Sequence, residues 1–77
     1  MKITIYGSGC AKCKQTEEIV RRAVAAAGVA AEIAKVGEMR EIARAGVLTT
    51  PAVAVDGAVK LAGRVPTAEE VQAWLSD

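Results

Sequence analysis

The placement of glycine divides this chain into short segments and limits what it can fold into. The 77 residues include seven glycines, and each lies at the boundary of a stretch with a regular apolar pattern. Glycine commonly marks the ends of helices and strands. The longest glycine-free stretch, residues 10–27, is long enough for a helix of several turns. The sequence therefore predicts an α/β chain with one long helix and several short elements.

The first half of the chain alternates between strand and helix patterns. Residues 2–6 alternate and are rich in β-branched and aromatic side chains, which predicts a strand. Residues 11–27 predict a helix that ends at Gly28, and residues 29–36 predict a second strand. The apolar stripe of this helix consists of Ile19, Val20, Ala23, Val24 and Ala27. Two strands joined by a helix are expected to be parallel, with a right-handed crossover.

The second half of the chain predicts a short helix followed by a hairpin. Residues 38–45 fit a helix, with one apolar side formed by Met39, Ile42 and Ala43. Residues 52–55 and 58–62 fit two strands, and Asp56-Gly57 between them is a two-residue turn that favours positive φ angles. These strands should therefore pair antiparallel.

A final helix completes the expected fold. Thr67 followed by Glu70 is a capping box, and the buried stripe of this helix is expected to be Val71, Trp74 and Leu75. The element order is then β-α-β-α-β-β-α. We expect residues 1–77 to form a single α/β domain, a four-stranded mixed sheet flanked by helices.

Charge and hydropathy exclude several classes of partner. The formal net charge is +1, and 25% of the residues are charged, so there is no basic cluster of the kind that binds nucleic acid. No apolar run reaches the ~18 residues of a membrane span. Residues 1–5 lead directly into a strand pattern and lack the features of a signal peptide. A cytoplasmic location is expected.

Cys10 and Cys13 are the only two cysteines of the chain. A bond between them would close a very small loop and constrain the unfolded chain little, so a purely structural role is a poor explanation. They lie where the first strand gives way to the first helix. Free N–H groups and the positive end of the helix dipole favour a thiolate there. Lys12 and Lys14 add positive charge nearby, so we expect the pKa of Cys10 to be lowered.

This arrangement predicts dithiol–disulfide exchange. Cys10 would be the exposed nucleophile, and Cys13, nearer the core, would resolve the mixed disulfide. The chain has no histidine and no glycine-rich dinucleotide motif, so we expect no bound nicotinamide or flavin cofactor. Metal binding by the two thiolates, or two cysteines without a function, are the alternatives that the Cys-x-x-Cys spacing leaves open.

The sequence Cys10-Ala11-Lys12-Cys13, with Thr49-Thr50-Pro51 downstream, resembles the thioredoxin/glutaredoxin superfamily, in particular its small archaeal and bacterial redox-active disulfide proteins. The resemblance implies a cis peptide bond before Pro51 and backbone hydrogen bonds from Thr50 to a bound substrate. The substrate-binding residues implied are Gly9, Ala11, Lys12, Thr50 and Pro51. It also implies protein disulfide substrates, an external reductase of the thioredoxin-reductase type, no cofactor beyond the Cys10–Cys13 couple, no metal, and a monomer.

The chain departs from that family at several positions. Gly9 stands where thioredoxins usually have tryptophan, and Ala11-Lys12 stand where they have Gly-Pro. Thr4 occupies the place of a buried aspartate that assists proton transfer in thioredoxins. Tyr6 is close enough in sequence to take part in that transfer, although packing is the better interpretation of a tyrosine in a strand.

A different class of protein shares the first half of this pattern. The loop from Gly7 to Cys13 and the later Gly28-Val29 are similar to heavy-metal-associated domains, which carry Cu(I) or zinc on two thiolates. Ser8 stands where those domains usually have methionine, and the predicted hairpin and final helix do not fit their second half. A regulatory or docking module that senses redox state through the same disulfide is a third possibility.

Overall fold

The computed structural model describes residues 1–7 and 9–76. The elements follow the expected order: β1 (Lys2–Tyr6), α1 (Ala11–Ala27), β2 (Glu32–Val36), α2 (Met39–Arg44), β3 (Ala52–Val55), β4 (Ala58–Ala62) and α3 (Ala68–Leu75). The strands form one four-stranded mixed sheet in the order β2-β1-β3-β4. β1 and β2 are parallel, whereas β3 is antiparallel to both β1 and β4.

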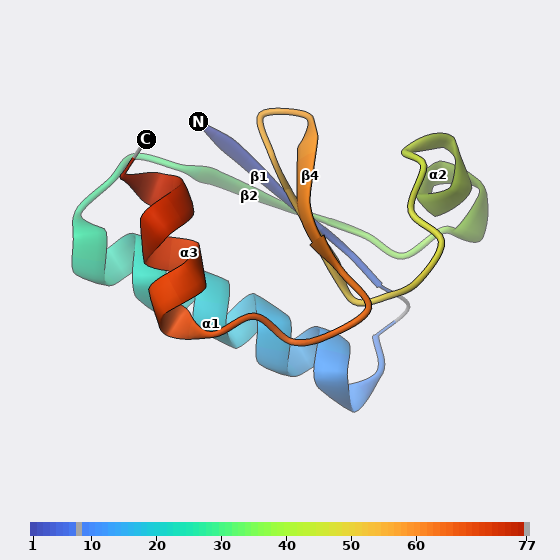
Figure 1. The fold of residues 1–77 in the computed structure, drawn as a ribbon, viewed down its shortest axis with the longest axis horizontal. Coiled ribbons are helices and arrows are strands. Elements are labelled where there is room, and N and C mark those ends of the chain that lie inside the picture. Colours follow the sequence, from blue (N-terminus) through green and yellow to red (C-terminus); the bar gives the residue numbers. More distant parts are fainter. Residues whose placement is uncertain (8, 77) are drawn as a thin grey trace.

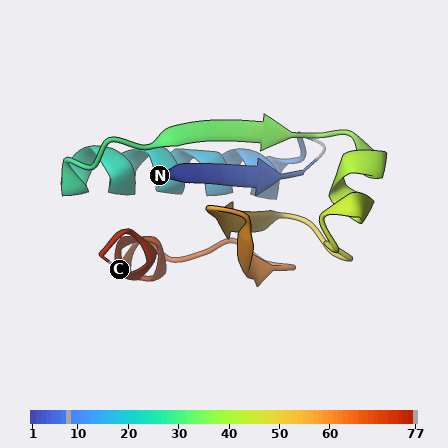
Figure 2. The ribbon, with the colours of Figure 1, turned by 90° about the horizontal axis from the view of Figure 1, so that it is seen from above.

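The helices lie on both sides of this sheet. α1 runs along the length of the sheet and packs beside α3, whereas α2 lies at the end of the molecule opposite α3 (Figures 1 and 2). The main core lies between the sheet and the pair α1 and α3, and its buried residues are Ile3, Ile5, Val20, Ala23, Val53, Val55, Val71 and Leu75. On the other face, α2 inserts Ile42 against Val47 and Ala52, with Tyr6 and Val36 at the edge. Tyr6 is therefore a packing residue, as the sequence indicated.

The boundaries of α1 are set by its two caps. Cys10 is the N-cap, with φ −68° and ψ 169°. Gly28 is the C-cap in the left-handed region, with φ 66°, and its N–H donates to the carbonyls of Val24 and Ala25. The prediction of residues 11–27 is thus confirmed. Ala27, expected in the buried stripe, is exposed, because this helix is about 25 Å long and its last turn extends past strands of about 17 Å.

Two elements differ from the prediction at their ends. The second strand begins at Glu32, not at residue 29, because its parallel register pairs Glu32 with Lys2 at the start of β1. Residues 29–31 therefore have no strand residue to pair with. The expected helix 38–45 is Met39–Arg44, with Glu38 and Ala45 as its caps. Only Ile42 of its expected apolar side is buried, and Met39 and Ala43 are exposed.

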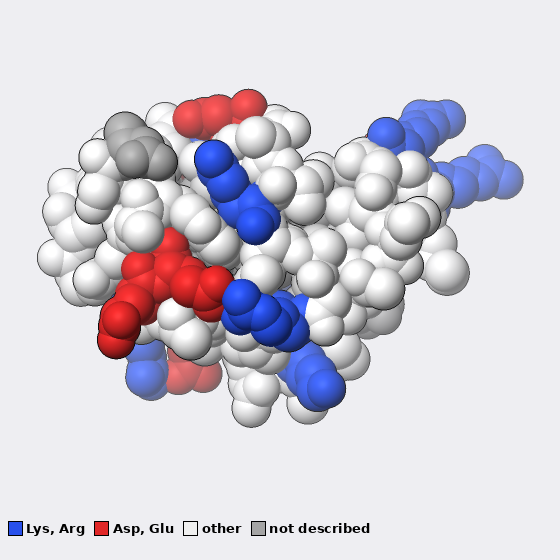
Figure 3. Space-filling view, in the orientation of Figure 1, with Lys and Arg blue, Asp and Glu red and all other residues white. Residues whose placement is uncertain are grey.

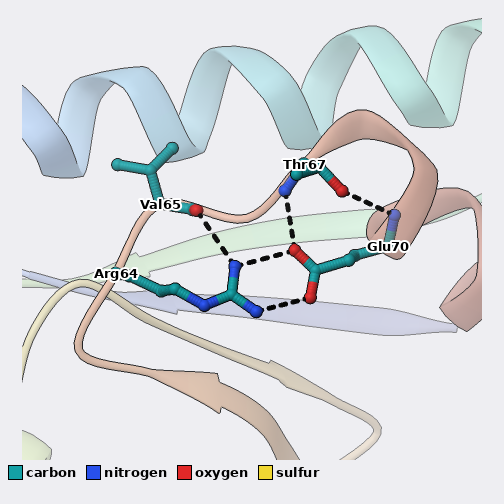
Figure 4. A network of polar contacts seen from close by, with 4 residues as sticks. All are labelled: Arg64, Val65, Thr67 and Glu70. Carbon is teal, nitrogen blue, oxygen red and sulfur yellow. Dashed lines mark hydrogen bonds and ion pairs between the residues drawn. The ribbon is translucent and has the colours of Figure 1, made fainter.

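The hairpin turn and the N-terminal cap of the last helix have the conformations that the sequence predicted. Asp56 and Gly57 both have positive φ angles, 50° and 87°, as a two-residue hairpin turn requires. Thr67 and Glu70 form the capping box, in which each side chain accepts from the backbone N–H of the other. Arg64 adds a two-pronged ion pair to Glu70, at 2.8 and 2.7 Å (Figure 4). This network fixes the loop that leads into α3.

The surface carries both signs of charge. Lys and Arg side chains project at the α2 end of the molecule, and acidic side chains gather over the start of α3 (Figure 3). In the described part of the chain, no helix has the length and apolar composition needed to cross a bilayer.

Candidate active site

Cys10 lies at the exposed N-terminus of α1. Its Sγ accepts a hydrogen bond from the backbone N–H of Cys13 at 3.4 Å, so the sulfur itself caps the helix. The neighbouring Gly9, Ala11 and Lys12 are also exposed, and Gly9 has a φ of 88° that suits glycine. Ser8 lies outside the described residues. The exposed sulfur of Cys10 is the one that another molecule can reach.

Cys13 lies one turn further along α1 and is only 6% exposed. Its Sγ is 2.7 Å from the Sγ of Cys10, and both cysteines are free. The sulfur packs against Gly7, where an added Cβ would come within 2.9 Å of the Cβ of Cys13 and closer still to its Sγ. Gly7 is fixed in turn by its N–H, which donates to the carbonyl of Val36 at 2.9 Å. The end of β1 thus provides the space that Cys13 occupies.

The two thiols differ in acidity. The pKa of Cys10 is lowered, first by the hydrogen bond from the Cys13 thiol and then by the backbone N–H of Cys13. The pKa of Cys13 is raised, first by burial and then by its hydrogen bond to Cys10. The expected lowering at Cys10 is therefore present, and its leading causes are the thiol and then the backbone N–H of Cys13 rather than the ammonium groups of Lys12 and Lys14. Cys10 is the sulfur that ionises first.

The loop before β3 meets this site at one end of the sheet, where the inner strands β1 and β3 are paired. Tyr6 pairs with Ala52 in the antiparallel ladder, so Gly7 and Pro51, the next residues on each side, adjoin. The peptide bond between Thr50 and Pro51 is cis, as the resemblance implied. Pro51 is buried, Thr50 is exposed, and the carbonyl of Pro51 accepts from the N–H of Gly63 at 2.9 Å. The structure thus brings both sequence motifs to one end of the sheet.

A small cavity adjoins Cys13, and sequence reasoning did not find it. Its volume is about 60 Å³, and its lining includes Ile5, Gly7, Cys13, Lys14, Glu17 and Lys35. Glu17 bridges Lys35 at 3.2 Å and Arg21 at 2.9 Å, and hydrogen bonds from these two cations lower its pKa. The i,i+4 spacing of Cys13 and Glu17 is the sequence feature that could have indicated that Glu17 lies near Cys13. The position of Lys35 at this cavity depends on the strand register that pairs Lys35 with Ile5, so no local sequence pattern could have indicated it.

The two cysteines are the candidate metal ligands at this site. Among residues 1–7 and 9–76, no group of three or more His, Cys, Asp or Glu side chains is placed to hold a metal ion. Thr4, which stands where thioredoxins have an aspartate, lies on β1 between the core residues Ile3 and Ile5 and is not part of the cavity lining. The arrangement is thus a pair of thiols of unequal acidity at a strand–helix junction, which is suited to making and breaking a disulfide.

Fold and site together define a thioredoxin-like dithiol protein. A family model described as "Thioredoxin domain" matches residues 1–76. The chain is 47% identical over 76 residues to a thioredoxin of Methanothermobacter thermautotrophicus, covering 99% of both chains. It is 46% identical over 70 residues to a thioredoxin of Methanocaldococcus jannaschii, covering 91% of this chain and 80% of the relative. The chain belongs to the thioredoxin domain family and is a thiol–disulfide oxidoreductase.

Proposed function

We propose that this oxidoreductase reduces disulfides in other proteins, with Cys10 as the nucleophile and Cys13 as the resolving thiol. The Cys10 thiolate attacks one sulfur of the substrate disulfide, forms a mixed disulfide and releases the other sulfur as a thiolate. The Cys13 sulfur then attacks the Sγ of Cys10. This step forms the Cys10–Cys13 bond and releases the second substrate sulfur as a thiolate. The observation that carries the proposal is the exposed, more acidic Cys10 sulfur 2.7 Å from the buried Cys13 sulfur.

The cycle needs two electrons from outside to reopen the Cys10–Cys13 bond. We propose an external reductase of the thioredoxin-reductase type as their source, because the sequence has no nicotinamide or flavin motif. The couple itself is then the only redox centre. We place the activity in the cytoplasm, where thiols are kept reduced, and in a monomer that acts as one domain over residues 1–77.

The substrate is expected to lie across the two loops that meet at the site. Gly9, Ala11 and Lys12 would contact it on the cysteine side, and Thr50 and Pro51 on the other. Thr50 is exposed just before the inner strand β3, next to the buried Pro51. A backbone segment of the substrate could therefore hydrogen-bond to Thr50 beside the attacked sulfur.

An apolar hollow next to Thr50 favours a protein chain over a small thiol as substrate. The hollow has a volume of about 230 Å³ and is lined by Met39, Ile42, Ala43, Val47, Leu48 and Thr50. Met39 is 81% exposed and Leu48 is 95% exposed. Large exposed apolar side chains gathered at one place are typical of interaction sites. An apolar side chain near the substrate cysteine would find contacts there.

Insulin reduction with single-cysteine variants tests the proposal. Cys10→Ser should abolish turnover, and Cys13→Ser should stop after one mixed disulfide per molecule. Ala26→Ser, which adds a hydroxyl on an exposed part of α1 far from the pair, is the matched control and should turn over normally. Full activity in both cysteine variants would refute the proposed roles.

A further inference from the structure

The buried position of Cys13 creates a chemical requirement that Cys10 does not share. Cys10 is exposed and can lose its proton to water directly. Cys13 is 6% exposed, and burial raises its pKa. It must nevertheless lose its proton when it attacks the mixed disulfide, because the thiolate is the nucleophile. A neighbouring group therefore has to receive that proton.

The cavity beside Cys13 can supply the path. One water needs about 10–15 Å³ and two to four polar partners, and this cavity has about 60 Å³. Its charged and titratable lining groups are Lys14 and Glu17 from α1 and Lys35 from β2, besides Cys13 itself. Two further groups face these: Arg21 binds Glu17, and Cys10 contacts Cys13.

Among the described residues that line the cavity, Glu17 is the carboxylate and the charged group that can accept a proton. The side chains of Lys14 and Lys35 end in ammonium groups, which donate hydrogen bonds and have no free electron pair. Glu17 lies four residues after Cys13, on the same side of α1. Lys35 at 3.2 Å and Arg21 at 2.9 Å each hold one of its carboxylate oxygens, and the side chain is only 22% exposed. The acceptor is thus fixed in place next to the buried thiol.

We propose that Glu17 accepts the proton of Cys13, through water in the cavity, during the resolving step. The S–H bond of Cys13 breaks as its sulfur forms the bond to Cys10. The bond between Cys10 and the substrate breaks, and its electron pair leaves on the substrate thiolate. The proton passes from Glu17 to solvent and then to that thiolate. Arg21 and Lys35 hold the carboxylate ionised between turnovers. The inference rests on the proposed role of Cys13 as the resolving thiol.

The two steps can be separated with Ellman's reagent on the reduced protein. Attack by Cys10 releases a first thionitrobenzoate, and attack by Cys13 releases a second. In Glu17→Gln the first release should keep its rate, and the second should be roughly tenfold or more slower at neutral pH. Glu18→Gln is the matched control, because Glu18 pairs with Arg22 at the same i,i+4 spacing and is not part of the cavity lining.

The pH profile distinguishes proton transfer from a structural role. At a pH above the pKa of Cys13 its thiol is already ionised, so Glu17→Gln should regain the wild-type rate. An effect of charge alone would have the opposite sign, since removing a nearby negative charge favours the thiolate. Glu17→Asp keeps a carboxylate and should restore part of the second rate.

Three results separate failure of this inference from failure of the proposed function. A second release in Glu17→Gln at the wild-type rate at neutral pH would overturn the role of Glu17. A second release that stays slow at every pH would assign Glu17 to structure and would also overturn it. Loss of the first release from the wild-type protein would instead refute the proposed role of Cys10.

Discussion

The sulfur of Cys13 packs directly against Gly7, and a Cβ at position 7 would come within 2.9 Å of the Cβ of Cys13. Gly7→Ala should therefore push the resolving sulfur away from Cys10. We expect this overpacking to lower the free energy of unfolding by about 1–3 kcal/mol and to slow the second thionitrobenzoate release. Urea denaturation and the two-phase release assay measure these effects. A variant with unchanged stability and unchanged second release would show that Gly7 does not set the position of Cys13.

The acidity of Cys10 depends first on the hydrogen bond from the Cys13 thiol. Cys13→Ala removes this donor and should raise the pKa of Cys10. The rate of alkylation by iodoacetamide, followed from acid to alkaline pH, gives this pKa directly. Lys12→Met removes a nearby positive charge instead, and it should raise the pKa of Cys10 less than Cys13→Ala does. A larger rise in Lys12→Met than in Cys13→Ala would assign the acidity to the lysine instead.

Some elements of this fold could be predicted from the sequence more accurately than others. Local chemistry determined α1, the Asp56-Gly57 turn and the capping box at Thr67, so these were predicted correctly. The start of β2 depended on the register with β1, which no local pattern specifies. The cavity was missed for the same reason, because Lys35 reaches Glu17 only through that register. The sequence therefore predicted both thiols and missed the polar groups behind them.

The ion pair between Arg64 and Glu70 should make stability depend on pH in the acid range. Hydrogen bonds from Arg64 and from the N–H of Thr67 lower the pKa of Glu70 from 4.5 to about 2 in the folded protein. The ionised carboxyl thus stabilises the fold when the pH is above 4.5, the pKa of Glu70 in the unfolded chain. This contribution is lost as the pH falls from 4.5 to about 2. Over this pH range, the midpoint of urea denaturation should fall less steeply in Glu70→Gln than in the wild-type protein. Equal slopes in both proteins would contradict this role, and Glu69→Gln is the neighbouring control.

The cap that Thr67 provides can be tested separately from the charge. Thr67→Ala removes the acceptor for the N–H of Glu70, which now bonds at 3.1 Å. Loss of an N-cap of this kind costs about 1 kcal/mol, which urea denaturation at neutral pH resolves. Thr67→Ser keeps the acceptor and should retain most of the stability. Similar losses in both variants would point to the methyl group instead of the hydroxyl.

The apolar hollow beside Thr50 should matter for proteins and not for small disulfides. Leu48→Asp removes an exposed apolar side chain and should raise KM for insulin roughly tenfold, as expected for partial burial of a leucine. The rate with Ellman's reagent should not change. Val59→Asp, at another exposed apolar position on β4, is the matched control. Equal effects of the two variants on KM would remove the hollow from the substrate site.

The most direct test of the account is the covalent intermediate. Reduced Cys13→Ser is mixed with insulin, and the products are analysed by mass spectrometry after digestion without reductant. The account predicts a one-to-one adduct in which Cys10 is joined to an insulin cysteine. No adduct at Cys10, together with tight one-to-one Cu(I) binding by the wild-type protein and no insulin reduction, would contradict it.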